Sequence, residues 1–266
     1  MTNQILPMGK VYETDIEGFI INEASADMIQ PPWTSVVEDV KDSYLNNWQK
    51  IHSIYIRGSI ARGSGVEGIS DVDTLAVVYG DKKDLDHSWV LNFKQEMLEK
   101  YPFCLDVELK CVPLNRLLNL EDEYCHTLRM IVQITAVCIW GDDVRPLLPK
   151  FKPGRETMKC ALVLSDNIDR LINWREEDKF NPRICQWIMK RILRSGFEIV
   201  MAEANCYTRD LYPCWQIFSR YYPEKREQMK QALHWAINPT DDHTEILSFL
   251  QDFGGWLVAR VQQLET

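Results

Sequence analysis

The sequence predicts an α+β fold: a small mixed β-sheet domain over residues 1–145, followed by an all-α helical bundle domain over residues 146–266. Two observations predict this division. In the first part, short β-branched runs alternate with segments of helical periodicity, whereas almost no strand pattern remains beyond Gly141. Three prolines between residues 146 and 153 interrupt both patterns and indicate a break between the domains.

Helical and strand patterns follow one another in the first domain. Ser35 followed by Glu38 is a capping-box pattern and predicts a helix that runs to Trp48. Alternating apolar residues, and Pro113 after the last of them, predict strands. The expected elements are strands 51–57, 72–79 and 103–112, helices 35–48, 85–101 and 114–140, the last in one piece or two, and a loop at 58–70 with at most one short helical turn.

The second domain is expected to consist of amphipathic helices. Apolar residues recur there at helical spacing, and turn signals such as Asn181-Pro182 and Tyr222-Pro223 separate the segments. The expected helices cover residues 157–175, 182–205, 213–222, 224–237 and 244–263.

Composition and charge favour a soluble enzyme that acts on small molecules. The 266 residues are 45% hydrophobic and 26% charged, which is typical of a globular protein. The formal net charge of −9 argues against general binding to DNA or RNA, where a basic face is expected.

The cysteines and the apolar segments favour the cytoplasm. The eight cysteines include no CxxC pair, and most lie in apolar stretches. The first ten residues lack the pattern of a signal peptide. The longest apolar run, Ile131–Trp140, is too short to cross a bilayer. We therefore expect a reduced cytoplasmic protein without membrane partners.

Two carboxylates at the start of the second predicted strand indicate a metal site. Asp71 and Asp73 are two residues apart, so on a strand both point to one face while Val72 points to the core. Adjacent carboxylates repel each other unless a cation lies between them. Because Mg²⁺ commonly binds one or two carboxylates together with substrate phosphates, the pair predicts a metal–nucleotide site.

A Gly-Ser pair at the end of the first predicted strand completes this pattern. Gly58 lets an anion approach the backbone closely, and the local N–H groups with the Ser59 hydroxyl can hold phosphate oxygens. Arg62 follows closely enough to add positive charge. We predict that Gly58, Ser59 and Arg62 bind the nucleotide.

The stretch Gly58-Ser59-Ile60-Ala61-Arg62-Gly63, followed by Ser70-Asp71-Val72-Asp73-Thr74-Leu75, resembles the signature of the polymerase-beta-like nucleotidyltransferase superfamily. The arrangement of a small sheet domain before a helical domain is similar to that of the bacterial antibiotic nucleotidyltransferases, above all the streptomycin/spectinomycin adenylyltransferase type. The resemblance implies transfer of a nucleoside monophosphate, usually from ATP, onto a hydroxyl with release of pyrophosphate. It also implies two Mg²⁺ ions.

The same resemblance implies a third carboxylate on a later strand. Asp106 and Glu108 are both candidates in the third predicted strand, and Asp106 is preferred because the family's third acid commonly occupies the first half of that strand. Glu108 is otherwise expected to pair with Lys110 or with a cation on a neighbouring strand. On this hypothesis Asp71, Asp73 and Asp106 bind the metal and Asp106 is also the general base. Glu198 and Glu203 in the helical domain remain alternative bases.

Three further segments have both a functional and a structural interpretation. Lys190, with Arg191 and Arg194, forms either a triphosphate-binding ridge or a solvated helix face. Residues 207–212 either line the acceptor pocket or simply connect two helices. Residues 140–143 either meet a cationic acceptor or form a polar turn.

The sequence thus predicts a Mg²⁺-dependent nucleotidyltransferase that transfers AMP from ATP to a small hydroxyl compound such as an aminoglycoside. One alternative is a protein of the same fold that acts by binding, as an antitoxin or sensor does. Another is an enzyme that modifies a protein or tRNA hydroxyl.

Overall fold

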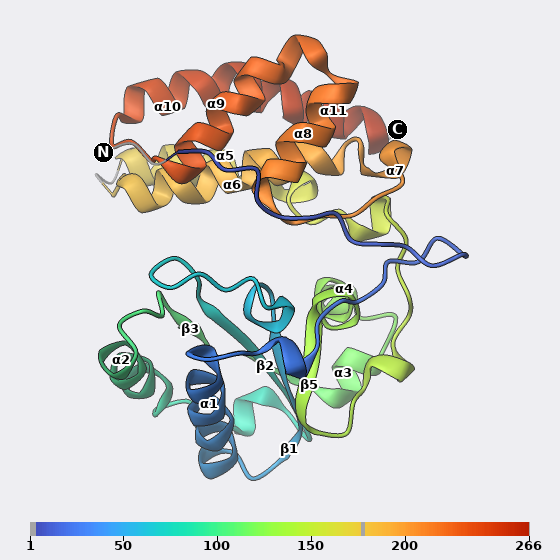
Figure 1. Ribbon diagram of the computed structural model, residues 1–266, viewed down its shortest axis with the longest axis vertical. Coiled ribbons are helices and arrows are strands. Elements are labelled where there is room, and N and C mark those ends of the chain that lie inside the picture. Colours follow the sequence, from blue (N-terminus) through green and yellow to red (C-terminus); the bar gives the residue numbers. More distant parts are fainter. Residues whose placement is uncertain (1–3, 177–178, 266) are drawn as a thin grey trace. The chain divides into compact units, whose positions relative to one another are not determined.

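The computed structural model describes residues 4–176 and 179–265. The chain divides into two compact units. The first, called the sheet unit, is Ile21–Phe151, and the second, called the helical unit, combines Met1–Ile20 with Lys152–Thr266. Figure 1 shows the strands confined to the sheet unit. The predicted α+β fold class is confirmed, because a small mixed sheet and a set of packed helices are both present.

Among the described residues, five short strands form one sheet. The central strands β1 (Ile51–Arg57) and β2 (Val72–Val78) run antiparallel. On one side, β5 (Ala136–Gly141) pairs antiparallel with β1. On the other, β3 (Val107–Glu108) and β4 (Cys111–Pro113) pair parallel with β2. The sheet is therefore mixed, in the order β3-β2-β1-β5, with β4 beside the far end of β2.

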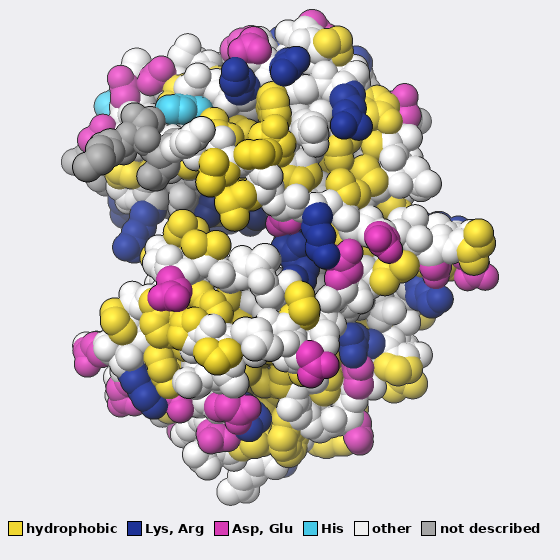
Figure 2. Space-filling model, viewed as in Figure 1, with side chains coloured by type: hydrophobic (Ala, Val, Ile, Leu, Met, Phe, Trp, Pro, Cys, Tyr) yellow, Lys and Arg dark blue, Asp and Glu magenta, His cyan; other side chains and the backbone are white. Residues whose placement is uncertain are grey.

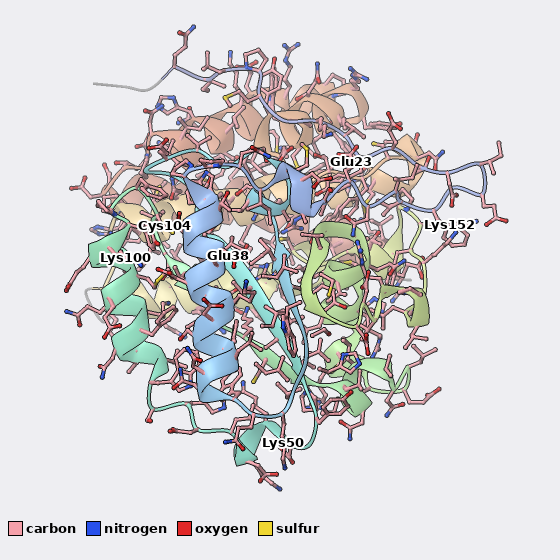
Figure 3. All side chains as sticks on the ribbon, turned by 60° about the horizontal axis from the view of Figure 1, so that its bottom comes forward. Glu23, Glu38, Lys50, Lys100, Cys104 and Lys152 are labelled. Carbon is pink, nitrogen blue, oxygen red and sulfur yellow. The ribbon has the colours of Figure 1, made fainter. Side chains whose placement is uncertain are left out.

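One face of the sheet packs against α1 (Trp33–Asn47) and α2 (Val90–Lys100). Ile56 of β1 is fully buried in this apolar cluster. Lys100 at the end of α2, labelled in Figure 3, bonds to Asp39 of α1 at 2.5 Å. The two helices therefore cover this face side by side, and the Lys100–Asp39 ion pair links them.

The opposite face packs against α3 (Leu114–Leu118) and α4 (His126–Thr135). Tyr55 of β1 and Leu75 of β2 are register partners on this face, and both are buried with Val132 of α4. Side chains two residues away from Tyr55 and from Leu75 must share this face, which decides where the polar residues described below lie.

The helical unit is built around α6 (Pro182–Glu198), which packs against five other α-helices of the described residues. Asn181 caps α6, because its Oδ1 accepts hydrogen bonds from two backbone N–H groups of the first turn. The remaining helices are α5 (Leu164–Glu176), α7 (Met201–Ala204), α8 (Leu211–Tyr221), α9 (Arg226–Ile237), α10 (His243–Phe249) and α11 (Gly255–Glu265). A five-residue π-helix joins α10 to α11.

The N-terminal segment groups with the helical unit, whereas the sequence placed residues 1–145 together. Tyr12 donates its N–H to the carbonyl of Tyr207 at 2.8 Å, and the two rings meet edge to face at 5.4 Å. The Thr208 hydroxyl donates to the carbonyl of Lys10 at 2.8 Å. These contacts join positions about two hundred residues apart, so no local sequence pattern could reveal them.

Three elements differ from their predicted form. The predicted helix 114–140 is broken, because its last part forms β5. The apolar run at 131–140 suits a buried helix and a buried strand equally well. The predicted strand 103–112 is two short strands that begin at Val107. The first helix begins at Trp33 with Pro32 as its N-cap, so Ser35 does not cap it.

Across the residues that the structure describes, every helix is too short or too polar to span a bilayer. On the face drawn in Figure 2, acidic and basic side chains are interspersed over both units.

Candidate active site in the sheet unit

One cationic and two anionic side chains form a row across three strands, at one end of these strands. Arg57 is the register partner of Asp73 across the antiparallel β1–β2 pair, and Asp73 is the register partner of Glu108 across the parallel β2–β3 pair. Arg57 follows Tyr55 by two residues, so the row lies on the sheet face covered by α3 and α4. We call Arg57, Asp73 and Glu108 the charged row.

Arg57 bonds to both carboxylates of the charged row. Its Nη2 lies 2.9 Å from Asp73 Oδ1 and also contacts Glu108 Oε2. The Lys110 ammonium lies 2.6 Å from the other Glu108 oxygen. Burial, and then the charge of Arg57, lower the pKa of Lys110. Two cations and two anions therefore balance each other around the start of β3.

The Gly-Ser turn lies directly beside this row. Gly58 has φ +77°, and a Cβ atom added to it would lie 3.1 Å from Asp73 Oδ2. Glycine is therefore favoured by the backbone conformation, and any other residue would also require the Asp73 carboxylate to shift by a few tenths of an ångström. The Gly58 N–H already donates to the carbonyl of Thr135 at 3.3 Å. Of the predicted phosphate donors at this turn, the Ser59 hydroxyl is thus better placed than the Gly58 N–H.

Ser59 starts the one-turn helix η2 (Ile60–Arg62), and its side chain does not cap that helix. Its carbonyl accepts hydrogen bonds from the N–H groups of Arg62 at 3.2 Å and Ser64 at 2.9 Å. These backbone hydrogen bonds close the turn. Arg62 is half-buried at the end of η2.

Asp71 immediately precedes β2 and is exposed, whereas Val72 is fully buried. The strand start therefore presents Asp71 to solvent and Val72 to the core, as alternation predicts. Asp73 is more enclosed, since its side chain is 23% exposed.

The third predicted acid is placed differently from the charged row. Asp106 bonds to Lys94 of α2 at 2.9 Å, and its Oδ1 accepts the N–H of Val107 at 2.8 Å. Because β3 begins at Val107, Asp106 lies outside the strand and does not share the side-chain alternation that directs Glu108. The structure thus brings Glu108, and not Asp106, into contact with the partners of Asp73.

A family model described as the nucleotidyltransferase domain matches residues 37–122, which include Gly58, Asp73 and Glu108. The chain contains a nucleotidyltransferase domain. The predicted resemblance to polymerase-beta-like nucleotidyltransferases is confirmed, and the family model supports the prediction of an enzyme of this type.

Among solved structures, the chain is similar to spectinomycin adenyltransferase AAD(9) from Enterococcus faecialis, crystallised with ATP and spectinomycin. The sequences are 16% identical, the match covers 86% of this chain and 99% of that chain, and the TM-score is 0.55. At this identity the likeness concerns the fold. No curated protein sequence matches the chain.

The nucleotidyltransferase domain offers a donor set that fits Mg²⁺ carried by a nucleotide. The described residues contain no cluster of three or more potential metal ligands. Mg²⁺, however, is usually held by one or two carboxylates with phosphates and water completing its shell. Asp71 and Asp73 are two such carboxylates, and Asp73 Oδ2 lies over the bare backbone of Gly58. The residues therefore fit a cation that arrives with its triphosphate.

The predicted residues of the helical unit are largely engaged with one another. Lys190 is half-buried on α6. Arg191 lies over the Trp187 ring at 5.6 Å, and Arg194 donates from Nε to the carbonyl of Arg209 at 3.3 Å. Arg191 and Arg194 therefore stabilise the packing around α6, and the nucleotide-binding role of Lys190 stays a prediction.

Glu198, an alternative base, is enclosed at the end of α6. Its Oε2 accepts the backbone N–H groups of Lys159, Cys160 and Ala161 at 3.0, 2.8 and 2.7 Å. Its Oε1 pairs with Arg209 at 3.1 Å. Four donors therefore occupy both oxygens, which favours a structural role. Glu203, by contrast, is exposed.

The two remaining predicted segments are used structurally. In the segment 207–212, Tyr207 is buried, and burial raises its pKa to about 12. At the end of β5, Asp143 accepts a hydrogen bond from the Tyr55 hydroxyl at 3.0 Å and pairs with Arg145 at 2.6 Å. Tyr207 and Asp143 therefore hold local structure together.

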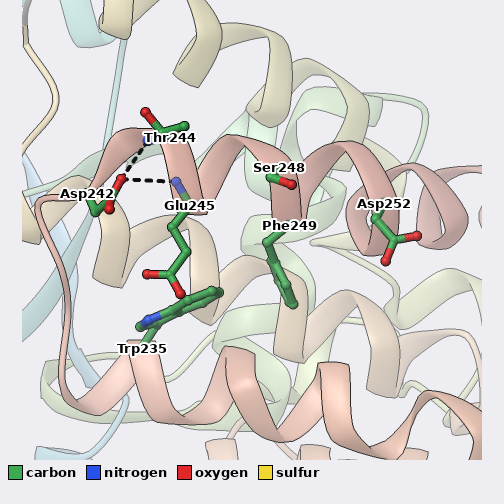
Figure 4. Close-up of a pocket in the computed structure, with 7 residues that line it drawn as sticks. All are labelled: Trp235, Asp242, Thr244, Glu245, Ser248, Phe249 and Asp252. Carbon is green, nitrogen blue, oxygen red and sulfur yellow. Dashed lines mark hydrogen bonds between the residues drawn. The ribbon is translucent and has the colours of Figure 1, made fainter.

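An open hollow of about 690 Å³ lies in the helical unit. Figure 4 shows Trp235 and Phe249 with carboxylates along one side. Asp242 accepts the N–H groups of Thr244 and Glu245 and so caps α10. None of the predicted site residues lines this hollow.

Sequence reasoning missed Arg57, which connects the charged row. A usable signal was present: Arg57 ends an apolar strand directly before Gly58, and alternation places it on the face of Tyr55. Only the strand register reveals that it stands opposite Asp73.

Proposed function

We propose that this protein is a Mg²⁺-dependent nucleotidyltransferase that transfers AMP from ATP to a hydroxyl of a small molecule such as an aminoglycoside, releasing pyrophosphate. The observation that carries the proposal is the closeness of Asp73 to the Gly58 turn, where an added Cβ would lie 3.1 Å from Oδ2. A carboxylate that close to a glycine places a metal ligand beside a stretch of backbone without a Cβ atom, which a phosphate group can approach.

In the proposed reaction, the acceptor hydroxyl oxygen attacks the α-phosphorus, and the bond from that phosphorus to the oxygen bridging to the β-phosphate breaks. Pyrophosphate leaves with the bonding electrons, and the hydroxyl proton passes to a carboxylate. When bound, two Mg²⁺ ions neutralise the phosphate charge and lower the pKa of the attacking hydroxyl. Asp71, Asp73 and a third acid would hold these ions.

Asp106 and Glu108 compete for the part of third acid and general base. Asp106 is half-exposed and pairs with Lys94, a partner that water or a metal ion can replace. Glu108 contacts Arg57 and Lys110, so freeing it requires two ion pairs to open. We retain Asp106 as the proposed base and Glu108 as the direct rival.

The proposed substrates are based on the similar solved structure and on the net charge of the chain. The similar Enterococcus enzyme was crystallised with ATP and spectinomycin, which makes these the first compounds to test. The net charge of −9 favours the approach of a cationic acceptor. Gly58, Ser59 and Arg62 are the proposed triphosphate contacts of the sheet unit. We also propose a cytoplasmic location, where ATP is available.

The test is pyrophosphate release by the full chain with MgCl₂, ATP and a panel of acceptors led by spectinomycin, streptomycin and other aminoglycosides. Release that requires one acceptor, and that is lost in Asp71→Asn and Asp73→Asn, is expected. GTP and CTP serve as nucleotide controls. Mg²⁺-dependent stabilisation by ATP without turnover on any acceptor would contradict the proposal and favour the binding-protein alternative.

A further inference from the structure

The guanidinium of Arg57 occupies the space between two carboxylates that come from different strands. It bonds to Asp73 Oδ1 at 2.9 Å and to Glu108 Oε2. The three side chains are 15%, 23% and 33% exposed, so water only partly screens their charges. Without Arg57, Asp73 and Glu108 would face each other as register partners with like charges.

We propose that Arg57 is a positioning residue of the active site: it is the internal counter-ion that holds Asp73 and Glu108 together before a metal ion arrives, and it orients Asp73 toward the Gly58 turn. The inference rests on the proposed function, because it assigns Asp73 to the metal. It adds a role for a side chain outside the Gly-Ser and Asp-Val-Asp motifs.

Orientation follows from which oxygen Arg57 binds. Arg57 takes Oδ1 of Asp73, and Oδ2 of the same carboxylate lies over Gly58. A carboxylate fixed through one oxygen has its other oxygen fixed as well, because the group is planar. Rotation away from the turn would break the ion pair. Arg57 therefore keeps Oδ2 on the side where the nucleotide is proposed to bind.

The geometry suits arginine and not lysine. A planar guanidinium presents several N–H donors in a fixed arrangement and can bridge two carboxylates, whereas an ammonium is a point charge on a flexible stem. Lys110 contributes a second cation, which pairs with Glu108 Oε1 and interacts with Asp73 through its charge. Arg57 is the group that bonds directly to a carboxylate of β2 and to one of β3.

The first experiment is a double-mutant cycle measured by thermal unfolding of the full chain without metal. Arg57→Met keeps most of the side-chain volume and is expected to lower the Tm by about 4 °C. Glu108→Gln removes one of the facing charges, so the double variant is expected to recover at least half of the Tm that Arg57→Met loses. The proposal would be overturned if Arg57→Met left the Tm unchanged, or if Arg57→Met lowered the Tm equally in the wild-type and Glu108→Gln backgrounds.

Two variants keep this experiment interpretable. Arg57→Lys retains the charge and is expected to lose less stability than Arg57→Met. If Arg57→Met does not fold, Arg57→Gln, which also removes the charge, replaces it in the cycle. Arg116→Met is the matched control, because Arg116 pairs with Asp122 at 2.7 Å in the same unit but is half-exposed. A loss of less than about 2 °C is expected for the control.

The second experiment adds millimolar MgCl₂ alone. A divalent cation can replace the missing guanidinium charge, so the Tm of Arg57→Met should rise more than that of wild type, while Arg116→Met should follow wild type. Equal shifts in all three proteins would overturn the counter-ion role. If wild type responds to neither MgCl₂ nor Mg-ATP while the cycle shows coupling, the proposed function fails and the counter-ion role stands.

Discussion

Asp73 and Glu108 stand opposite each other on the parallel strands β2 and β3, and one guanidinium bonds to both. Alternation alone predicts that Asp73 shares a face with Asp71, but it says nothing of the neighbouring strand. The register supplies that information and extends the acidic motif into a row of charges. The following predictions test which members of the row act on substrate and which hold it in place.

Asp71→Asn and Asp73→Asn should each lower pyrophosphate release by orders of magnitude while the protein stays folded. Asparagine keeps the size of the side chain but removes the charge that binds a divalent cation. Turnover and unfolding should be measured on the same preparations. Asp84→Asn is the control, because Asp84 is an exposed acid on the same unit outside the site. Near-normal turnover in both site variants would refute their metal role.

Gly58→Ala should weaken Mg-ATP binding more than Gly68→Ala does. Both glycines have positive φ, +77° and +74°, so alanine strains both backbones, by roughly 1–2 kcal/mol. Only at position 58 does the added Cβ meet a carboxylate, whereas nothing lies within 4 Å of it at position 68. Calorimetric titration with Mg-ATP isolates this contact. Equal affinities in the two variants would show that the closeness to Asp73 is unimportant.

Asp106→Asn should bind ATP but lose transfer, if Asp106 is the base. Glu108→Gln tests the rival in the same single-turnover assay, with ATP affinity as the control for binding. Because Glu108 belongs to the charged row, Glu108→Gln should also change stability, whereas Asp106→Asn breaks only a half-exposed pair with Lys94. Normal transfer in Asp106→Asn together with a dead Glu108→Gln would assign the base to Glu108.

The sequence predicted the central strands closely, because their β-branched alternation and the bounding glycines are local signals. Residues 51–57 form β1 as predicted. The motif residues beside these strands were likewise readable from spacing. Spacing did not show how Asp106 and Glu108 are placed relative to each other, since that depends on where β3 begins. Spacing did not show the role of Arg57 either, because its partners lie sixteen and fifty-one residues away. Local patterns specify elements, and strand register specifies which side chains meet.

The stability of Asp143→Asn should fall less steeply than that of wild type as the pH is lowered. Burial alone would raise the pKa of Asp143, but hydrogen bonds and charge from Arg145 hold that pKa below its usual value. A depressed carboxyl pKa stabilises the fold above the unfolded-state value of about 3.9 and loses that contribution as the pH falls through the folded-state pKa. The Tm difference between wild type and Asp143→Asn should therefore be constant near neutrality and shrink below about pH 4. Asp142→Asn, at an exposed neighbour, should show no such change.

Glu198→Gln should destabilise the helical unit strongly without acting on the chemistry. The Glu198 side chain is 2% exposed, pairs with Arg209 at 3.1 Å and accepts three backbone N–H groups. Removing its charge leaves Arg209, whose side chain is 19% exposed, without its carboxylate. The cost is therefore expected to lie at or below the ~3–5 kcal/mol of breaking a fully buried pair. Denaturant unfolding should report this loss, whereas Glu203→Gln at an exposed site should stay within about 0.5 kcal/mol of wild type. If Glu198 were also the general base, Glu198→Gln would in addition lose single-turnover transfer under conditions where the variant is folded. A variant that loses stability but keeps transfer while folded therefore assigns Glu198 a structural role alone, and measuring both quantities on one variant separates the two cases.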